Sequence, residues 1–247
     1  MLKVASHREP LLLNASLIGS VAPGILSELR PEFSLGITLT SLDSQWHLSG
    51  PADLALAQLA RALQAAGHCP HWRDELLGVY ASQGQMLGAI ERGATRILGI
   101  HTQAVHLVGY SENGIWLQQR AMTKSDDPGK WDTLSGGMVS RNESFEQALE
   151  RETLEEAGLN ASELHELFYQ GSFDISEATV GGQGWRQETL HWYSARLSSK
   201  HKPRNLDGEV LQFQCIERDI LQEWIAAGKL SSDASRIFQA ALDRRLI

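Results

Sequence analysis

Residues 137–159 read GMVSRNESFEQALERETLEEAGL, and the rest of the chain is organised around this stretch. Ser144 and Gln147 have the spacing of a capping box, in which each side chain binds a backbone N–H at the start of a helix. Gly158 is a natural residue to end that helix, because glycine adopts a left-handed backbone without strain. The stretch therefore predicts a helix over residues 145–157.

The last turns of this helix carry three carboxylates, Glu152, Glu155 and Glu156. Spacings of three and four residues bring Glu152 to the same side as the other two, where like charges repel by about 0.2–0.5 kcal/mol per pair. The negative end of the helix dipole adds a penalty of about 0.3–1 kcal/mol for each nearby carboxylate. A bound cation would balance this charge, and carboxylate oxygens are ligands that suit Mg²⁺ or Mn²⁺.

The spacing of the fixed residues resembles the Nudix box. Gly137 is followed after five residues by Glu143, and after seven more by the run 151–159. Every Gly, Glu and Arg of the pattern is present, and the one departure is Thr153, where an aliphatic residue is usual. The resemblance implies a Nudix α/β/α sandwich that uses Mg²⁺ or Mn²⁺ to hydrolyse a diphosphate linked to another moiety.

The resemblance also implies a role for each charged residue of the box. Glu152 and Glu156 are expected to bind the metal, and Glu155 is either a third ligand or the general base. Arg151 is expected to brace Glu155, one turn further on, and the loop of Glu143, because a guanidinium group suits carboxylate pairs.

Two glycines stand just before the helix. Gly136 and Gly137 let the backbone approach closely, so a Gly137 carbonyl is expected to complete the metal shell and Gly136 to lie against the substrate. Glu209 lies on a later loop and is read either as a further metal ligand or base, or as a solvated carboxylate.

Three other side chains are candidates for substrate binding. Arg120 and Lys124 would hold the terminal phosphate, although a surface strand end has the same appearance. Trp131 would stack on a heteroaromatic ring, and core packing is the alternative for it.

Segments outside the box are similar to the thiamine-pyrophosphokinase-associated branch of the Nudix hydrolases, which has an N-terminal domain of its own. These segments are residues 72–76, 99–110, 123–124, 128–132 and 205–210. The resemblance implies that the substrate is thiamine diphosphate or an oxidised analogue and that the product is the monophosphate. The sequence departs at Trp131, where a smaller apolar residue is more usual before Asp.

Composition limits the other classes of function. The formal net charge of the 247 residues is −8, which disfavours sequence-independent binding to nucleic acid or to an anionic membrane. Cys69 and Cys215 are far apart and are expected to be reduced thiols without function. The apolar run at residues 11–18 is interrupted and too short to span a membrane, so we expect a soluble cytoplasmic protein.

Periodicity and turn residues predict a Nudix domain over residues 99–247, preceded by a smaller α+β domain over residues 1–98 that shapes substrate access or forms a homodimer. The first 45 residues give no clear pattern. Helices are predicted at 52–63, 91–98, 218–227 and 232–246, and strands at 77–80, 86–90, 102–110, 115–120, 167–173, 187–196 and 210–216. Asn113-Gly114 predicts a hairpin turn, and residues 181–184 a mobile one.

Other functions remain open beside the thiamine diphosphate hypothesis. The substrate could be of the ADP-ribose or dinucleotide type. An enzyme resembling isopentenyl-diphosphate isomerase would retain the diphosphate, and a non-catalytic sensor would only bind a diphosphate metabolite. In each case the partner is a small-molecule diphosphate.

Overall fold

The computed structural model describes residues 4–29, 32–81, 83–179, 183–198 and 202–247. Its internal contacts divide the chain into two compact units, the first comprising residues 1–103, 139–142 and 174–189 and the second the remaining residues. The predicted domain boundary after residue 98 stays a prediction. Among the described residues, none of the helices has the length and apolar character of a membrane-spanning segment.

The first unit contains a four-stranded sheet in the order β2-β1-β4-β3 and a two-stranded sheet. Helix α1 buries Leu56, Leu59 and Leu63, whose spacing of three and four residues places them on one face. The elements are β1 (Glu9–Leu13), β2 (Ser16–Val21), β3 (Thr38–Leu42), β4 (Gln45–Ser49), α1 (Ala52–Ala65), β5 (Leu76–Tyr80), β6 (Met86–Glu91) and α2 (Arg92–Thr95).

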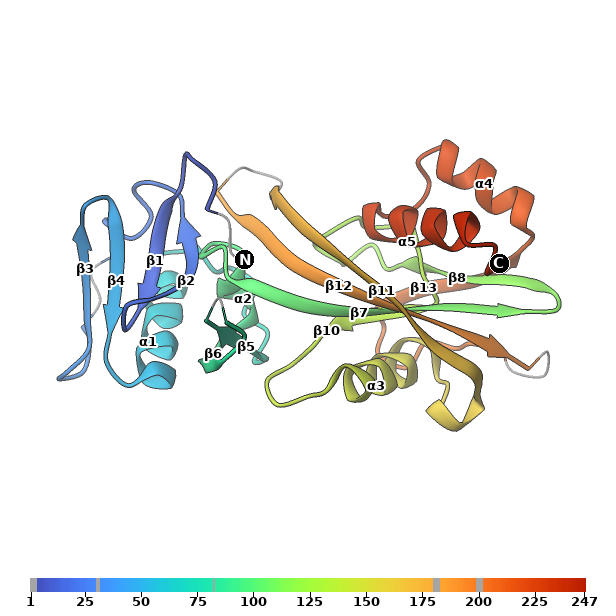
Figure 1. Ribbon diagram of the computed structural model, residues 1–247, viewed down its shortest axis with the longest axis horizontal. Coiled ribbons are helices and arrows are strands. Elements are labelled where there is room, and N and C mark those ends of the chain that lie inside the picture. Colours follow the sequence, from blue (N-terminus) through green and yellow to red (C-terminus); the bar gives the residue numbers. More distant parts are fainter. Residues whose placement is uncertain (1–3, 30–31, 82, 180–182, 199–201) are drawn as a thin grey trace. The chain divides into compact units, whose positions relative to one another are not determined.

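The second unit is built on a seven-stranded sheet in the order β11-β12-β7-β8-β13, with β10 paired to β7 and β9 to β8. Helix α3 lies on one face of this sheet, and α4 and α5 lie on the other (Figure 1). The predicted α/β/α arrangement is therefore confirmed. The elements are β7 (His101–Ser111), β8 (Gly114–Arg120), β9 (Trp131–Asp132), β10 (Ser135–Met138), α3 (Phe145–Ala157), a 3₁₀ turn (Ala161–Glu163), β11 (Leu164–Ala178), β12 (Trp185–Leu197), β13 (Val210–Ile216), α4 (Arg218–Ala226) and α5 (Ser232–Asp243).

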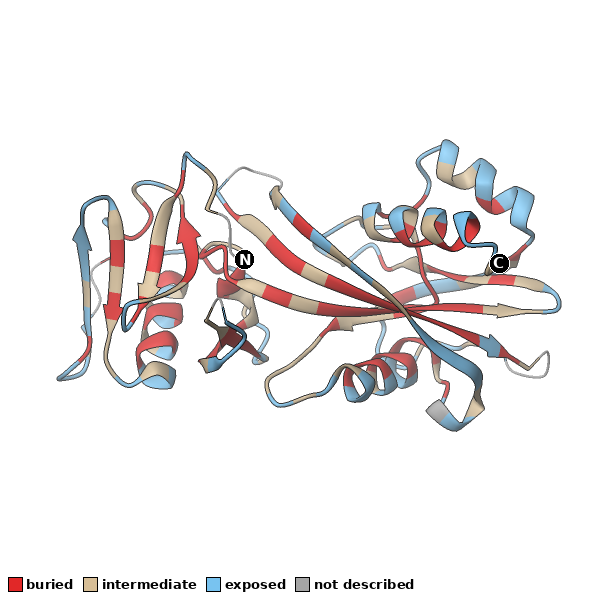
Figure 2. Cartoon of the chain, viewed as in Figure 1, coloured by how far each residue is buried: buried red, intermediate tan, exposed pale blue. Residues whose placement is uncertain are grey.

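Burial follows this layering. Strands β7 and β12 are buried along most of their length because helices cover both faces, whereas the edge strand β11 is mostly exposed (Figure 2). The predicted hairpin is confirmed, since Ser111 pairs with Gly114 directly across it.

Several predicted elements differ from the structure. The helix expected at 91–98 is the four-residue α2, the strands β11 and β12 are longer than predicted, and the strands β1 to β4, β9 and β10 were missed. Two residues of the predicted turn, 181 and 182, lie outside the described residues. Both cysteines are free, and burial raises the pKa of the Cys69 thiol to about 11, which disfavours the reactive thiolate.

Candidate metal centre

Helix α3 has the bounds that its capping residues predict. The Ser144 hydroxyl accepts a hydrogen bond from the Gln147 N–H at 3.2 Å, and the Gln147 side chain accepts one from the Ser144 N–H at 2.8 Å. At the other end Gly158 has a φ of 64°, and its N–H bonds the carbonyl of Leu154. These caps fix which side chains face the sheet, and Glu152 and Glu156 are among the buried ones.

Glu156 is the most deeply buried carboxylate of the box, with 1% of its side chain exposed. Its Oε2 accepts hydrogen bonds from the Gly136 N–H and the Gln118 Nε2, both at 2.8 Å, while its Oε1 lies 3.6 Å from Lys124 Nζ. Burial raises the pKa of Glu156 to about 8, and nearby Glu152 adds to this rise; the lysine and the two hydrogen bonds oppose it. The site therefore holds a carboxylate whose charge needs a strong cation.

Glu152 lies against the backbone of Gly137. A β-carbon at residue 137 would overlap the Glu152 carboxylate, so a larger residue there would force this carboxylate to move. The two predicted metal groups, the Glu152 carboxylate and the Gly137 peptide, are thus brought together.

Arg151 braces the box as predicted. Its Nε and Nη2 donate to the two oxygens of Glu143 at 2.8 and 2.9 Å, and its Nη1 donates to Glu152 at 2.6 Å and to Glu155 at 3.3 Å. Nη2 also donates to the Met138 carbonyl at 3.0 Å. The Glu143 hydrogen bonds are the main cause that raises the pKa of Arg151, so the guanidinium stays charged and fixes three carboxylates.

A second group of carboxylates reaches Glu156 from the loop before β13. Ligand oxygens of Glu156, Asp207 and Glu209 all lie within 4.8 Å of one another. The Leu206 N–H donates to the Glu155 carbonyl at 3.0 Å, which ties this loop to the end of α3. Glu209 is therefore placed at the centre, and Asp207 joins it although the sequence reasoning gave Asp207 no role.

The shape of this loop depends on Asn205. Its Oδ1 accepts hydrogen bonds from the N–H groups of Asp207 and Gly208 at 3.2 and 3.0 Å, and its Nδ2 donates to the Val210 carbonyl at 2.8 Å. Asp207 Oδ1 in turn accepts from the Glu209 N–H at 2.8 Å. Such side-chain turns present the two acidic side chains next to each other.

The two predicted phosphate-binding cations have carboxylate partners. Lys124 Nζ makes a short ion pair with Glu209 Oε2. Arg120 donates to Asp132 at 3.0 Å and to the Asp126 carbonyl at 3.0 and 3.1 Å, so it shapes the loop between β8 and β9. Lys124 is at the carboxylate centre, whereas the contacts of Arg120 are with this loop and with β9.

Trp131 contacts a different part of the second unit. Its ring lies 4.9 Å from that of Trp224 on α4, and the backbone N–H of Trp131 donates to the Lys229 carbonyl at 3.0 Å. The neighbouring residue Asp132 pairs with Gln118, whose side chain reaches Glu156. Since adjacent strand residues point to opposite faces, Trp131 and Gln118 lie on opposite faces of the sheet.

His106 and Gln118 also lie at the site, and neither is predicted from the sequence. A β-carbon at Gly136 would come within 2.6 Å of His106 Nδ1, and the same nitrogen lies 2.8 Å from Thr133 Oγ1. Strand pairing brings His106 opposite Gly136. The sequence held no signal for these contacts, because strand register brings His106 to Gly136 and the packing of α3 on the sheet brings Glu156 to Gln118.

The residues present fit a hard divalent cation. Carboxylate oxygens from α3 and from the 205–209 loop come together beside the buried Glu156, and oxygen ligands suit Mg²⁺ or Mn²⁺. Among the described residues, Gln118 Oε1 is a buried acceptor without a hydrogen-bond partner, although its Nε2 binds Glu156. Water molecules held by a cation are natural donors to such an atom.

Comparison with known proteins identifies the family. Residues 100–239 match the family model described as NUDIX domain, which covers more than half of the chain. The chain belongs to the Nudix family. Its Nudix box joins the end of β10 to α3, and Nudix enzymes generally use divalent metal ions at this position.

Two relatives from Arabidopsis thaliana extend the similarity toward the N-terminus. Nudix hydrolase 24, chloroplastic, is 27% identical over 84% of this chain and 59% of its own length. Nudix hydrolase 20, chloroplastic, is 29% identical over 66% of this chain and 44% of its own length. The Nudix chain described here therefore spans less than two thirds of either relative.

A solved structure agrees with the fold. The crystal structure of DR0079 from Deinococcus radiodurans covers 67% of this chain and 98% of its own, with a TM-score of 0.54 and 21% sequence identity. This likeness supports a shared Nudix fold and carries no statement about substrate.

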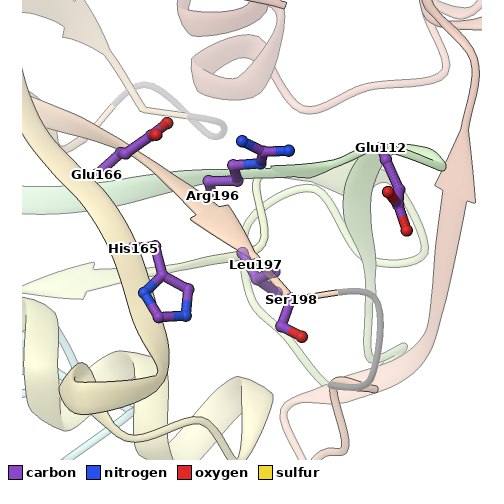
Figure 3. A pocket seen from close by; sticks show the side chains of 6 residues that line it. All are labelled: Glu112, His165, Glu166, Arg196, Leu197 and Ser198. Carbon is purple, nitrogen blue, oxygen red and sulfur yellow. The ribbon is translucent and has the colours of Figure 1, made fainter.

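A cavity of about 600 Å³ lies elsewhere in the second unit, at the ends of β11 and β12 and beside the β7–β8 turn (Figure 3). It is lined by Glu112, His165, Glu166, Arg196, Leu197 and Ser198, among which there is no residue of the Nudix box. Glu112 comes from the β7–β8 turn and His165 from the start of β11. The cavity mixes both signs of charge and gives no clear preference for a diphosphate.

Proposed function

We propose that this chain is a Mg²⁺- or Mn²⁺-dependent hydrolase that cleaves the phosphoric anhydride bond of a diphosphate linked to an organic group. The observation that carries the proposal is the buried Glu156 carboxylate, which lies beside Glu152 on α3 and within 4.8 Å of Asp207 and Glu209 oxygens. The negative charge of a diphosphate repels nucleophiles. A metal ion held by these carboxylate oxygens would reduce that repulsion.

The residues divide into metal-holding and positioning groups. Glu152, Glu156 and the Gly137 carbonyl would hold the ion, with Asp207 as an added ligand. Glu155 and Glu209 would each be either a further ligand or the proton acceptor. When bound, the ion would neutralise the diphosphate and lower the pKa of a water molecule. The resemblance to the Nudix box assigns these roles, and the contacts of Glu152 and Glu156 support them.

Proton transfer is assigned to an exposed carboxylate. Glu155 and Glu209 have 47% and 43% of their side chains exposed, so both can reach a water molecule from solvent. Either carboxylate can accept the proton of the water molecule as its oxygen attacks phosphorus and the bridging P–O bond breaks. Arg151 keeps Glu155 in place by hydrogen bonds and takes no proton itself.

For the organic half, we propose thiamine diphosphate or an oxidised analogue, with the monophosphate as product. The support is the similarity of residues 72–76, 99–110, 123–124, 128–132 and 205–210 to that Nudix branch. A cytoplasmic location and a homodimer formed through the N-terminal unit belong to the same proposal. ADP-ribose and dinucleotides are the alternative substrates.

A substrate panel tests the function. The purified chain is incubated with Mg²⁺ or Mn²⁺ and oxidised thiamine diphosphates, thiamine diphosphate, ADP-ribose, NADH or nucleoside triphosphates, and phosphate and organic products are measured. Glu156→Gln is expected to lower turnover by several orders of magnitude, whereas Glu150→Gln, an exposed change on the same helix, serves as the matched control. Absence of hydrolysis on every compound, or double-bond migration with the diphosphate retained, would overturn the proposal.

A further inference from the structure

Lys124 occupies a particular position at the carboxylate centre. Both hydrogen-bond donors of Glu156, the Gly136 N–H and the Gln118 amide, are on its Oε2, while Lys124 Nζ faces Oε1 at 3.6 Å. The same ammonium pairs with Oε2 of Glu209. Lys124 therefore contacts one carboxylate oxygen of each of these two residues.

The same oxygens are those a divalent ion would use. Glu156 Oε2 is already engaged by two N–H donors, so Oε1 is the atom left for a metal, and the oxygens of Glu156, Asp207 and Glu209 come together within 4.8 Å. An ammonium and a divalent cation cannot share these oxygens, because like charges repel strongly at such short separations.

The backbone of Lys124 allows its side chain to leave. Lys124 lies in a turn of the loop between β8 and β9, where its N–H bonds the Ala121 carbonyl at 3.2 Å, and the Ala121 N–H bonds the Glu209 carbonyl at 2.9 Å. The turn holds the start of the side chain near Glu209. Four rotatable methylene groups then let the ammonium move while the backbone stays fixed.

We propose that Lys124 is a competitive occupant of the metal centre, whose ammonium contacts Glu156 and Glu209 until a divalent ion displaces it. One ammonium contacts two carboxylates, and a divalent ion brings twice the charge to them, so the ion displaces the ammonium at sufficient concentration. The displaced ammonium becomes available to a phosphate oxygen of the substrate. This inference rests on the proposed function in taking Glu156 and Glu209 as metal ligands.

Metal titration of the full chain tests the competition. Mg²⁺ and Mn²⁺ affinities are measured by calorimetry, without substrate, for the wild type, Lys124→Met, Lys124→Arg and Lys130→Met. Removal of the ammonium is expected to tighten metal binding about tenfold, which corresponds to the free energy of a hydrogen bond to a charged group. Lys130, in the same loop, contacts the Gly228 carbonyl, so its variant should keep wild-type affinity, and Lys124→Arg should stay near wild type. Thermal melts confirm that each variant is folded.

Amine labelling gives a second test, because the labelling rate of a purely structural lysine would not depend on Mg²⁺. Lys124 should react slowly without added metal and faster when Mg²⁺ is saturating, while Lys130 should react at one rate in both conditions. Unchanged or weaker metal binding by Lys124→Met would overturn the inference. A labelling rate of Lys124 that is the same with and without Mg²⁺ would also overturn it. Tighter binding in Lys124→Met together with no hydrolysis of any diphosphate would support the inference and refute the proposed activity, so the two failures are distinguishable.

Discussion

The carboxylate of Glu152 lies where a side chain at residue 137 would have to begin, so Gly137 and Glu152 are complementary in shape. Gly137→Ala is expected to push the Glu152 carboxylate away from the peptide and to lower both metal affinity and turnover by about 10- to 100-fold, as loss of a well-placed group does. The cost in free energy of unfolding should be only about 1–3 kcal/mol, because the atoms that must yield are the end of one side chain.

Calorimetric metal titration and chemical denaturation check this prediction together. Gly67→Ala is a suitable control, since Gly67 has a φ of 82° and open space around it. It should cost about 1 kcal/mol through backbone strain alone and leave metal binding unchanged. Equal losses of metal affinity in both variants would contradict the role given to Gly137.

Arg151 and Glu143 should be energetically coupled. Arg151→Lys loses the paired hydrogen bonds to Glu143, and a lysine cannot replace the fork that also holds Glu152 and Glu155. We expect turnover to fall by about 10- to 100-fold. A double-mutant cycle with Glu143→Gln, measured by denaturation, should give a coupling of about 1 kcal/mol or more. Additive effects would mean that Arg151 acts independently of the loop.

Local signals made helix α3 predictable. Its caps, its length and the alignment of Glu152 with Glu156 all depend on residues within a few positions of one another, and Arg151 reaches Glu155 within one turn. Such relations are set by helix geometry and can be deduced without knowing the fold.

Contacts between residues far apart in the sequence could not be predicted from local patterns. Gln118 approaches Glu156 across 38 residues of sequence, and His106 meets Gly136 only through strand register. Asp207 lies within the segment 205–210 that resembles the family, but its approach to Glu156 depends on how the 205–209 loop folds back on α3.

The missed strands of the first unit have a local cause. The turn between β1 and β2 uses Asn14 and Ala15 at φ values of 46° and 69°, and the turn between β3 and β4 uses Asp43 and Ser44 at 50° and 60°. Left-handed turns normally favour glycine at one position, so these pairs give a weak signal. Asn14 compensates with two side-chain hydrogen bonds to Gly50, at 2.9 and 3.0 Å, which the sequence alone does not reveal.

Stability without added metal should depend on pH through Glu156. Its pKa is raised from 4.5 to about 8, mainly by burial, so the folded protein holds a proton there that the unfolded chain has lost. The contribution of Glu156 to stability therefore falls as pH rises from about 4.5 to about 8 and is fully lost above that range. Glu156→Gln should remove this part of the pH dependence.

Melting temperatures between pH 5 and 9, with a chelator and with excess Mg²⁺, check this prediction. Because metal binding requires the deprotonated carboxylate, the Mg²⁺-induced rise in melting temperature should grow toward pH 8 in the wild type. In Glu156→Gln the rise should be small and should vary less with pH. A wild-type rise that is the same at pH 5 and pH 8 would argue against Glu156 as a ligand.

Asn205 should control metal affinity from outside the carboxylate cluster. It binds no proposed ligand oxygen, yet its side chain makes the three hydrogen bonds that shape the loop carrying Asp207 and Glu209. Asn205→Ala should weaken Mg²⁺ binding about tenfold or more, as loss of supporting contacts around metal ligands does. Its cost in free energy of unfolding should be only about 1 kcal/mol, since the loop is largely exposed. Asn160→Ala, which removes a side-chain contact to Glu163 at an exposed position, should leave metal affinity unchanged. If Asn205→Ala binds Mg²⁺ as tightly as the wild type in a calorimetric titration, the 205–209 loop contributes no ligand, and the metal centre is confined to β10 and α3.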